Sequence, residues 1–252
     1  MPSNHFNPND PISQLVWLAH EVGREDRGLV LLNEGSVSTR VAQNCFAIKV
    51  AGTALATLTR EQVVECDTDK VCRILDLQFL KPPDLAKELS LTRLRLQSPM
   101  PSSESCLHAW LLQQEGVNFV AHCHPESCLQ VLCSPGAEKF AENRSFVDEI
   151  HSCGSRSVFV PYADPGVALA REVRARFSLF TRQNQGRPPR LVLLQNHGLL
   201  ALGPTPEAVL SSVLSAERSA RVLVGSARLG GVVFLPPPVC RRIEEDQVAW
   251  KR

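Results

Sequence analysis

The stretch 117-VNFVAHCHP-125 decides the fold, because it is an apolar segment that ends in two histidines and a proline. Its β-branched and aromatic residues favour a strand, on which side chains two residues apart point to the same face. His122 and His124 therefore present two imidazoles to one face of a sheet. Imidazole is a common ligand of divalent transition metals, so the pattern predicts a metal site at a strand end. A chance pair of histidines is the alternative, and a third ligand decides between the two.

The third ligand is predicted in 190-RLVLLQNHGLLALG-203, which has the pattern of two strands around His197 and Gly198. A histidine beside a glycine at a strand end can be aimed into a pocket, although an exposed turn histidine is the alternative. Three histidines leave one position on the metal open, which is typical of a catalytic site. The remaining histidines are interpreted as surface or core residues: His5, His20, His108 and His151.

Geometry places a carboxylate beside the histidine pair. A helix expected over residues 103–115 runs about 20 Å at 1.5 Å per residue, and the strand 117–122 returns about 20 Å. The start of the helix therefore lies beside the end of the strand, with Glu104 near His122 and His124. At that place Glu104 can act as a metal ligand, a general base or both. Stabilisation of the helix dipole by a first-turn acid is the alternative role.

The rest of the chain combines stretches expected as strands with stretches expected as helices. Asp10 with Pro11 and Thr205 with Pro206 each predict a helix start, and residues 81–90 are interpreted as irregular. Mixed strands and helices without regular βαβ repetition favour an α/β layered domain. Further strands are expected at 45–50, 62–66, 72–79, 91–97 and 157–162, and further helices from Ser102 or Ser103 to Gly116, over 125–132 and from Pro165.

Composition limits the class of protein. The 252 residues are 44% hydrophobic and 21% charged, which suits one globular unit with a hydrophobic core. We expect one domain over residues 1–252, with an N-terminal extension over 1–10 and a C-terminal tail over 235–252 that contains a linker and a short charged helix. The near balance of 27 basic and 26 acidic residues argues against a nucleic-acid partner.

The sequence also predicts the compartment. No apolar run reaches the roughly 20 residues of a membrane span, and the N-terminus lacks the pattern of a signal peptide. We therefore expect a cytoplasmic protein without a membrane partner, whose nine cysteines are thiols. A structural zinc site with Cys123, Cys128 or Cys133 is disfavoured. Cys123 points away from the two histidines, and the other two suit the apolar side of a helix.

Four motifs follow one another along the chain: 102-SSESCLH-108, 120-VAHCHP-125, 159-FVPYADPG-166 and 195-QNHGLLALG-203. Together they resemble the class II aldolase/adducin family, within which the fuculose- and rhamnulose-phosphate aldolases are the most similar, and the resemblance extends over about residues 11–230. It implies a three-layer α/β/α fold with a central, largely antiparallel sheet. It also implies a homo-oligomer, a tetramer, with active sites between subunits.

The resemblance implies a role for single residues. The metal ligands match His122, His124 and His197, and the catalytic glutamate matches Glu104. Tyr162, the only tyrosine of the chain, matches a family tyrosine that crosses from a neighbouring subunit to act as an acid. A partly buried aromatic after a strand is the alternative for Tyr162.

The implied reaction is that of a metal-dependent aldolase, a lyase acting on a small hydroxy-carbonyl compound or sugar phosphate. A C–C bond breaks or forms through a metal-stabilised enediolate, with Zn²⁺ as the expected cation and Mn²⁺ or Fe²⁺ as possible replacements. Glu104 moves the proton on the enediolate carbon and Tyr162 the proton on the aldehyde oxygen. Epimerisation, decarboxylation or dehydration on the same metal site are alternatives. So is a non-catalytic adducin-like interaction module, which the retained histidines and glutamate disfavour.

The sequence departs from the family at the phosphate-binding positions. Ser36 stands where the family has Asn, and Ala51 replaces a hydroxyl residue. Two lost side-chain donors weaken a dianion site, so we expect weakened affinity for a sugar phosphate. A carboxylate or a differently placed phosphate is the alternative. The residues implied to bind the substrate anion are Gly35, Ser36, Gly52, Ser102 and Ser103.

Overall fold

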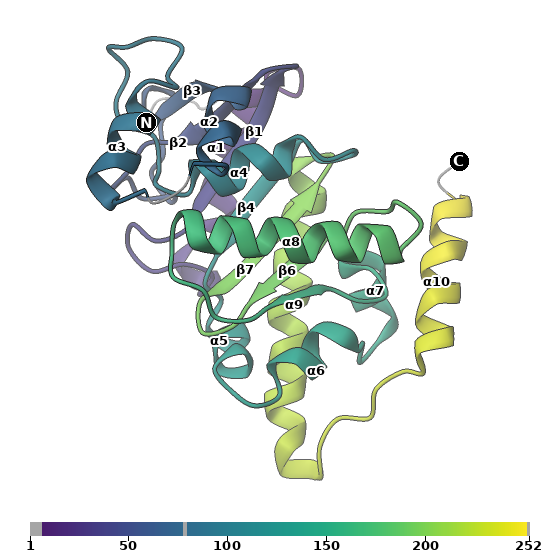
Figure 1. Cartoon of the computed structure of the whole chain (residues 1–252). Coiled ribbons are helices and arrows are strands. Elements are labelled where there is room, and N and C mark those ends of the chain that lie inside the picture. The colour runs from purple at the N-terminus through teal and green to yellow at the C-terminus, as the bar shows by residue number, and fades with distance from the viewer. Residues whose placement is uncertain (1–6, 78–79, 251–252) are drawn as a thin grey trace.

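The computed structural model describes residues 7–77 and 80–250. Within these residues the centre is a seven-stranded sheet in the order β3-β2-β1-β4-β7-β6-β5 (Figure 1). Neighbouring strands are antiparallel except for β5 and β6, which are parallel. The strands are β1 (Ser36–Ala42), β2 (Cys45–Lys49), β3 (Val63–Asp67), β4 (Phe119–Cys123), β5 (Val158–Val160), β6 (Leu191–Leu194) and β7 (Gly198–Gly203).

Helices cover both faces of the sheet and give three layers. The helices α1, α5, α6, α7 and α9 contribute to the core on one face, and α2, α4 and α8 to the core on the other. In Figure 1, α8 crosses in front of the sheet and α9 lies behind it. The helices are α1 (Pro11–Val22), α2 (Thr68–Ile74), α3 (Pro82–Ser90), α4 (Ser105–Leu112), α5 (Glu126–Leu132), α6 (Ala137–Glu142), α7 (Val147–Cys153), α8 (Val167–Gln183), α9 (Pro206–Ser226) and α10 (Pro237–Trp250).

The alternation along β4 shows how the two cores are separated. Ala121 and Cys123 pack into the core that contains α1 and α9, whereas Val120 packs into the core that contains α4 and α8. His122 follows the same alternation as Val120 and faces the α4 side. The predicted three-layer α/β/α fold with a largely antiparallel sheet is therefore confirmed. Cys123 points away from His122 into the core on the opposite face of the sheet, as expected.

Most predicted elements are confirmed, but the strand expected over 72–79 is wrong for the described residues. Residues 72–74 end α2, and a turn follows; residues 78 and 79 lie outside the described part of the chain. The helix begins because the Asp67 side chain accepts a hydrogen bond from the Lys70 amide. Val71 and Ile74 are then buried three positions apart, which is helical spacing.

The region that follows also differs from the prediction. Residues 81–90 contain α3 instead of an irregular segment, because Pro82 stands at the first helical position, where its missing N–H costs nothing. The strand expected over 91–97 is absent among the described residues, where one isolated bridge joins Cys66 and Arg93. The leucines of 91-LTRLRLQ-97 are exposed, so they give this segment no sheet face to bury.

The strand β1 was not foreseen from the sequence. It pairs with β2 on one side and with β4 on the other, so it lies in the middle of the sheet. The signal was the alternation in 36-SVSTRVA-42, whose serines Ser36 and Ser38 are fully buried on the α4 side. Polar residues on a buried strand need partners, and those partners belong to the candidate site.

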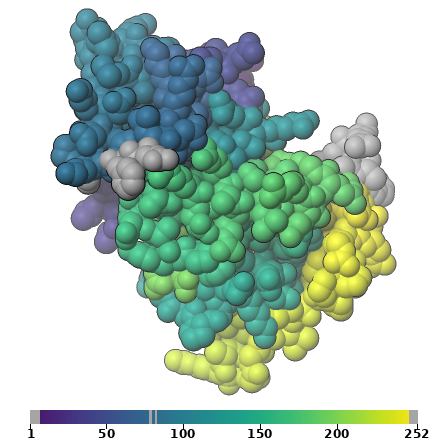
Figure 2. Space-filling view, in the orientation of Figure 1, coloured from purple at the N-terminus to yellow at the C-terminus, as the bar shows by residue number. Residues whose placement is uncertain are grey.

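The C-terminal tail forms the expected helix, α10, which packs on α7. Figure 2 shows it in yellow along the outer surface of the molecule. Of the N-terminal extension, residues 1–6 lie outside the described part of the chain. Among the described helices, none combines the length and the apolar character needed to cross a bilayer.

Candidate metal centre and active site

Two strand ends and one glycine bring the three histidines together. On β4, His122 is paired with Ser36 of β1 and with Leu200 of β7, so the end of β4 lies between these strands. A Cβ atom on Gly198 would lie 2.5 Å from the Cys123 carbonyl oxygen and 2.6 Å from His124 Cδ2. Only glycine permits β7 to begin this close to the end of β4, which brings the preceding residue into the site.

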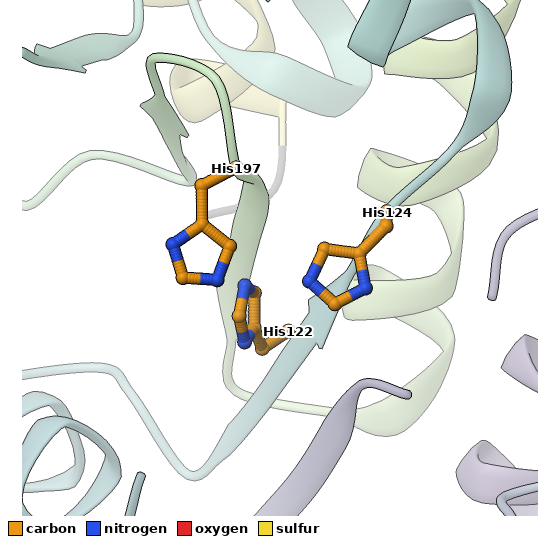
Figure 3. A group of neighbouring side chains, drawn as sticks. All are labelled: His122, His124 and His197. Carbon is orange, nitrogen blue, oxygen red and sulfur yellow. The ribbon is translucent and has the colours of Figure 1, made fainter. Parts of the chain in front are cut away.

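The three imidazoles face a common space, as Figure 3 shows. Their ring centroids are 4.7 Å apart for His122 and His124, and 4.9 Å apart for His122 and His197. The rings of His124 and His197 are stacked, with centroids 5.5 Å apart. One nitrogen of each ring lies within 4.8 Å of the others, so the three form a group that can hold a metal ion. Among the described residues, this group contains no cysteine.

The polar atoms of this cluster fit a divalent cation. His122 Nε2 and His124 Nδ1 are buried, and neither has a hydrogen-bond partner among the described residues. Buried polar atoms without partners are costly, and a cation between the three rings would satisfy His122 Nε2, whereas His124 Nδ1 lies on the side of Glu34. Burial lowers the pKa of His124 to about 3, with the charges of His122 and His197 acting in the same direction. Burial and the His122 charge also lower the pKa of His197. Unprotonated imidazoles are the form that binds metals.

Glu104 orients one of these rings. His122 Nδ1 donates a hydrogen bond of 2.6 Å to Glu104 Oε1, which leaves Nε2 directed at the other imidazoles. A carboxylate on the far nitrogen of a ligating histidine fixes its tautomer and raises its basicity. Burial alone would raise the pKa of Glu104, but the charge and hydrogen bond of His122, with His108 and the Ser36 hydroxyl, hold it well below its usual range.

The start of α4 differs from the prediction and explains why Glu104 is available. The helix begins at Ser105 with Glu104 at the N-cap, where its side chain makes no capping hydrogen bond. Ser102 and Ser103 precede the helix, and the Ser102 hydroxyl accepts a hydrogen bond of 3.3 Å from the Glu104 amide. The Glu104 carboxylate therefore turns toward β4 and β1.

A second histidine on the other side of Glu104 was not identified as functional from the sequence. His108 of α4 is fully buried; its Nε2 lies 2.7 Å from Ser36 Oγ and its Nδ1 lies 2.7 Å from Ser38 Oγ. Ser36 in turn donates to Glu104 Oε2. The available signal was the four-residue spacing of Glu104 and His108, which places both on one side of a helix.

The loops implied to bind the substrate anion lie next to this cluster. A Cβ atom on Gly35 would lie 2.7 Å from the His122 carbonyl oxygen, so only glycine fits there. The turn that contains Gly52 is joined to the segment before Ser102, because the Ala51 amide donates to the Met100 carbonyl at 3.1 Å. Ser102 is buried and Ser103 is exposed. The Ser36 hydroxyl is directed at Glu104 and His108, and its role toward an anion stays a prediction.

Lys49 and Glu34 add charge near the same cluster, and neither was identified from the sequence. Lys49 is 3% exposed, and its ammonium donates to the carbonyls of Asn33 at 2.8 Å and Thr53 at 2.6 Å, which ties the two loops together. Burial lowers its pKa, while the negative charge of Glu104 acts in the opposite direction. Glu34 Oε2 lies 3.5 Å from His124 Nδ1.

Tyr162 lies apart from this cluster within the chain. It follows β5 and is 59% exposed, and its hydroxyl donates to Asp164 Oδ1 at 3.1 Å. Its backbone amide donates to Gln195 Oε1 at 3.3 Å, which links it to the turn before His197. The carboxylate of Asp164 raises the pKa of the Tyr162 hydroxyl through this hydrogen bond. An exposed aromatic at a strand end is free to meet another molecule.

The fold and the site define a class of protein, and comparison with known proteins gives its family. Residues 13–224 match the family of the class II aldolase and adducin N-terminal domain. This match covers most of the sequence. The chain belongs to this family.

Solved structures agree in fold. The N-terminal class II aldolase domain of a conserved protein from Thermoplasma acidophilum superposes with a TM-score of 0.70 and 19% identity, over 89% of this chain and 100% of that one. An L-fuculose 1-phosphate aldolase superposes with a TM-score of 0.70 and 18% identity, over 96% of this chain and 98% of that one. Both are similar in fold to this protein.

A curated relative is longer. The uncharacterized oxidoreductase YuxG of Bacillus subtilis (strain 168) is 23% identical over 244 residues, which are 92% of this chain and 33% of that protein. The chain therefore spans about a third of the length of this relative.

Proposed function

We propose that this protein is a metal-dependent lyase of the aldolase type, which cleaves or forms a C–C bond in a small hydroxy-carbonyl compound. The single observation that carries the proposal is the meeting of three imidazoles, among them the buried His122 Nε2 that has no hydrogen-bond partner among the described residues, with Glu104 beside them. An interaction module has no need for such an arrangement. Its cost without a cation argues for a bound ion.

The cation would be held by His122, His124 and His197, with Zn²⁺ as the best match and Mn²⁺ or Fe²⁺ as chemically suitable replacements. Bound there, it supplies a Lewis acid for the hydroxyl and carbonyl oxygens of a ketose. Three protein ligands leave positions for substrate. Glu104 serves as an orienting partner of His122, and a further role of its carboxylate as a metal ligand stays a prediction.

Glu104 is the candidate general base for a proton on the substrate carbon next to the carbonyl. Its lowered pKa keeps it ionised at neutral pH, and its carboxylate lies at the edge of the imidazole cluster. Tyr162 is the candidate acid for the aldehyde oxygen, acting in the site of a neighbouring subunit of a homo-oligomer, a tetramer. Its exposure on this chain leaves the hydroxyl available for such a role.

The substrate is proposed to carry an anionic group that lies against the loops of Gly35 and Gly52 and the segment Ser102–Ser103. Lys49 supports this, since its buried ammonium holds both loops and has no carboxylate within salt-bridge distance among the described residues. The positive charge of Lys49 offsets part of the anion affinity that is lost with the side-chain donors at Ser36 and Ala51. We expect a carboxylate or a weakly bound phosphate.

The test is metal analysis of the purified protein together with a substrate screen. Retro-aldol cleavage is followed by the aldehyde released and decarboxylation by CO₂ released, across phosphorylated and carboxylated hydroxy-ketones. We expect about one divalent ion per chain and cleavage that a chelator abolishes and added Zn²⁺ restores. CO₂ release, epimerisation or dehydration without cleavage would assign the site to one of the alternative reactions. A protein that neither contains nor binds a divalent ion would instead be an interaction module.

Sharing of the site between subunits has its own test. Glu104→Gln and Tyr162→Phe are each expected to lower activity strongly when pure. Mixed oligomers formed by co-expression contain some sites with both wild-type residues if the two come from different subunits. Recovered activity in the mixture supports the shared site, and activity equal to the mean of the two pure variants argues against it.

A further inference from the structure

The hydrogen bonds on the far side of Glu104 form a chain with a single direction. Ser36 Oγ has one hydrogen, and it is donated to Glu104 Oε2. The contact of 2.7 Å between Ser36 Oγ and His108 Nε2 then requires Nε2 to be the donor. His108 Nδ1 lies 2.7 Å from Ser38 Oγ.

The remaining contact of His108 is to Ser38. Its Nδ1 faces the Ser38 hydroxyl at 2.7 Å, an arrangement that a neutral ring with a single hydrogen satisfies. With that hydrogen on Nε2, the ring's Nδ1 accepts from the Ser38 hydroxyl. Every donor of the chain is then used, in the order Ser38, His108, Ser36 and Glu104. All three residues before Glu104 are fully buried, so water does not compete with these bonds.

We propose that Ser36 and His108 are positioning residues that hold the Glu104 carboxylate in place for the proton transfer. Glu104 is otherwise poorly fixed, because it stands before the first turn of α4 and its side chain is partly exposed. His122 holds one of its oxygens and Ser36 holds the other. Ser36 therefore holds the general base, Glu104, and does not bind the substrate anion.

The place of Ser36 in the sheet determines what its side chain can reach. Ser36 is the first residue of β1 and pairs with His122 of β4. A short hydroxyl side chain at this register reaches Glu104 and is covered by His108. The residue type at position 36 therefore decides between a contact to the base and a contact to an incoming anion.

The first experiment needs neither metal nor activity. Nitrogen-15 NMR of histidine-labelled protein at pH 7 separates the two neutral tautomers, and the His108→Gln variant identifies the signals of His108. We expect His108 as the Nε2–H tautomer in the wild type, with its Nε2 signal shifted in Ser36→Ala and unshifted in Ser212→Ala. Ser212 is a matched control because its buried hydroxyl bonds to two carbonyls on α9 and α7, away from the site. A His108 that carries no hydrogen on Nε2 would overturn the proposal.

Only the second experiment depends on the proposed function. We expect Ser36→Ala to lower kcat about 10-fold, the loss typical of one hydrogen bond to a charged group, with KM little changed. His108→Gln retains an N–H donor near the Nε2 position and should keep more kcat than His108→Asn, which reaches only the Nδ1 position. A rise in KM alone for Ser36→Ala, or equal kcat for the two His108 variants, would overturn the positioning role.

The two experiments separate this inference from the proposed function. If the tautomer is as expected but the protein has no lyase activity, the proposed function fails and the hydrogen-bond chain stands. If the wild type is active and Ser36→Ala behaves like Ser212→Ala in both measurements, the chain has no positioning role and the proposed function stands. Thermal unfolding of each variant shows that kcat is compared between folded proteins.

Discussion

Glu104 lies between two buried histidines, His122 and His108, that differ in how many of their ring nitrogens have hydrogen-bond partners. On one side, His122 gives its Nδ1 hydrogen to Oε1 and leaves a buried Nε2 without a partner among the described residues. On the other side, Ser36 holds Oε2, and His108 behind it has a partner at each ring nitrogen. Both imidazoles are fully buried. The difference is hydrogen-bond saturation.

This difference distinguishes a ligand from a support. A saturated buried imidazole needs nothing further and contributes rigidity. An unsaturated one is costly unless something else binds it, and two more imidazoles lie within reach of the same point. The comparison therefore supports the metal binding proposed for the side of His122 and the positioning role proposed for the side of His108.

The largest effect is expected from removing a ligand. His124→Ala takes away one of the three imidazoles, and we expect metal content and cleavage activity both to fall below detection, because Lewis-acid stabilisation is worth several kcal/mol. Metal analysis and initial rates test this, with His151→Ala, an exposed histidine on α7, as the control. Full turnover by His124→Ala would remove the metal role from this side of Glu104.

A smaller effect is expected from neutralising the residue between the two regions. Glu104→Gln keeps the size of the side chain but cannot take up a proton, so we expect kcat to fall by about 10² to 10⁴, as for other general bases. Metal content should stay near that of the wild type, since the three imidazoles remain. A Glu104→Gln protein that loses the metal together with activity would make Glu104 a ligand first and a base second.

The metal side of this comparison was accessible from the sequence, and the support side was not. His122 and His124 share a strand face by local alternation alone, and their neighbours in 120-VAHCHP-125 match a family motif. The length of the preceding helix and strand was enough to place Glu104 near them, although α4 begins later than expected. Strand alternation and the lengths of the helix and strand are therefore enough to predict that His122, His124 and Glu104 lie close together.

His108 was interpreted as a surface or core residue because its role depends on pairing between distant segments. Its partners lie on β1, a strand that was not foreseen, and the register of β1 against β4 decides which serines face α4. Lys49 was missed for a similar reason, since its acceptors are backbone carbonyls of two loops. The error over 72–74 has a local cause instead, since apolar residues near Val71 favour a helix once Asp67 caps it.

The smallest effect, on stability, tests both sides of Glu104 together. His108 and His124 have pKa values lowered to about 4 and about 3, whereas unfolded histidine titrates near 6.5. Above pH 6.5 neither state binds these protons, so the full stability is present. As the pH falls below 6.5 the unfolded chain takes up protons that the folded chain refuses, and the folded state loses stability until about pH 4.

We therefore expect the free energy of unfolding of the metal-free protein, and with it the urea midpoint, to fall steadily from pH 6.5 to pH 4, the free energy by a few kcal/mol in total. His108→Gln should show a shallower fall, because one of the refused protons is gone. His124→Ala should do the same, and the two slopes measure how strongly each side resists protonation. Added Zn²⁺ should steepen the fall in the wild type and not in His124→Ala, since only the metal side exchanges protons for a cation. A midpoint that does not change between pH 6.5 and pH 5 would mean that neither imidazole is held neutral by the fold, and the contrast between the two sides of Glu104 would lose its physical basis.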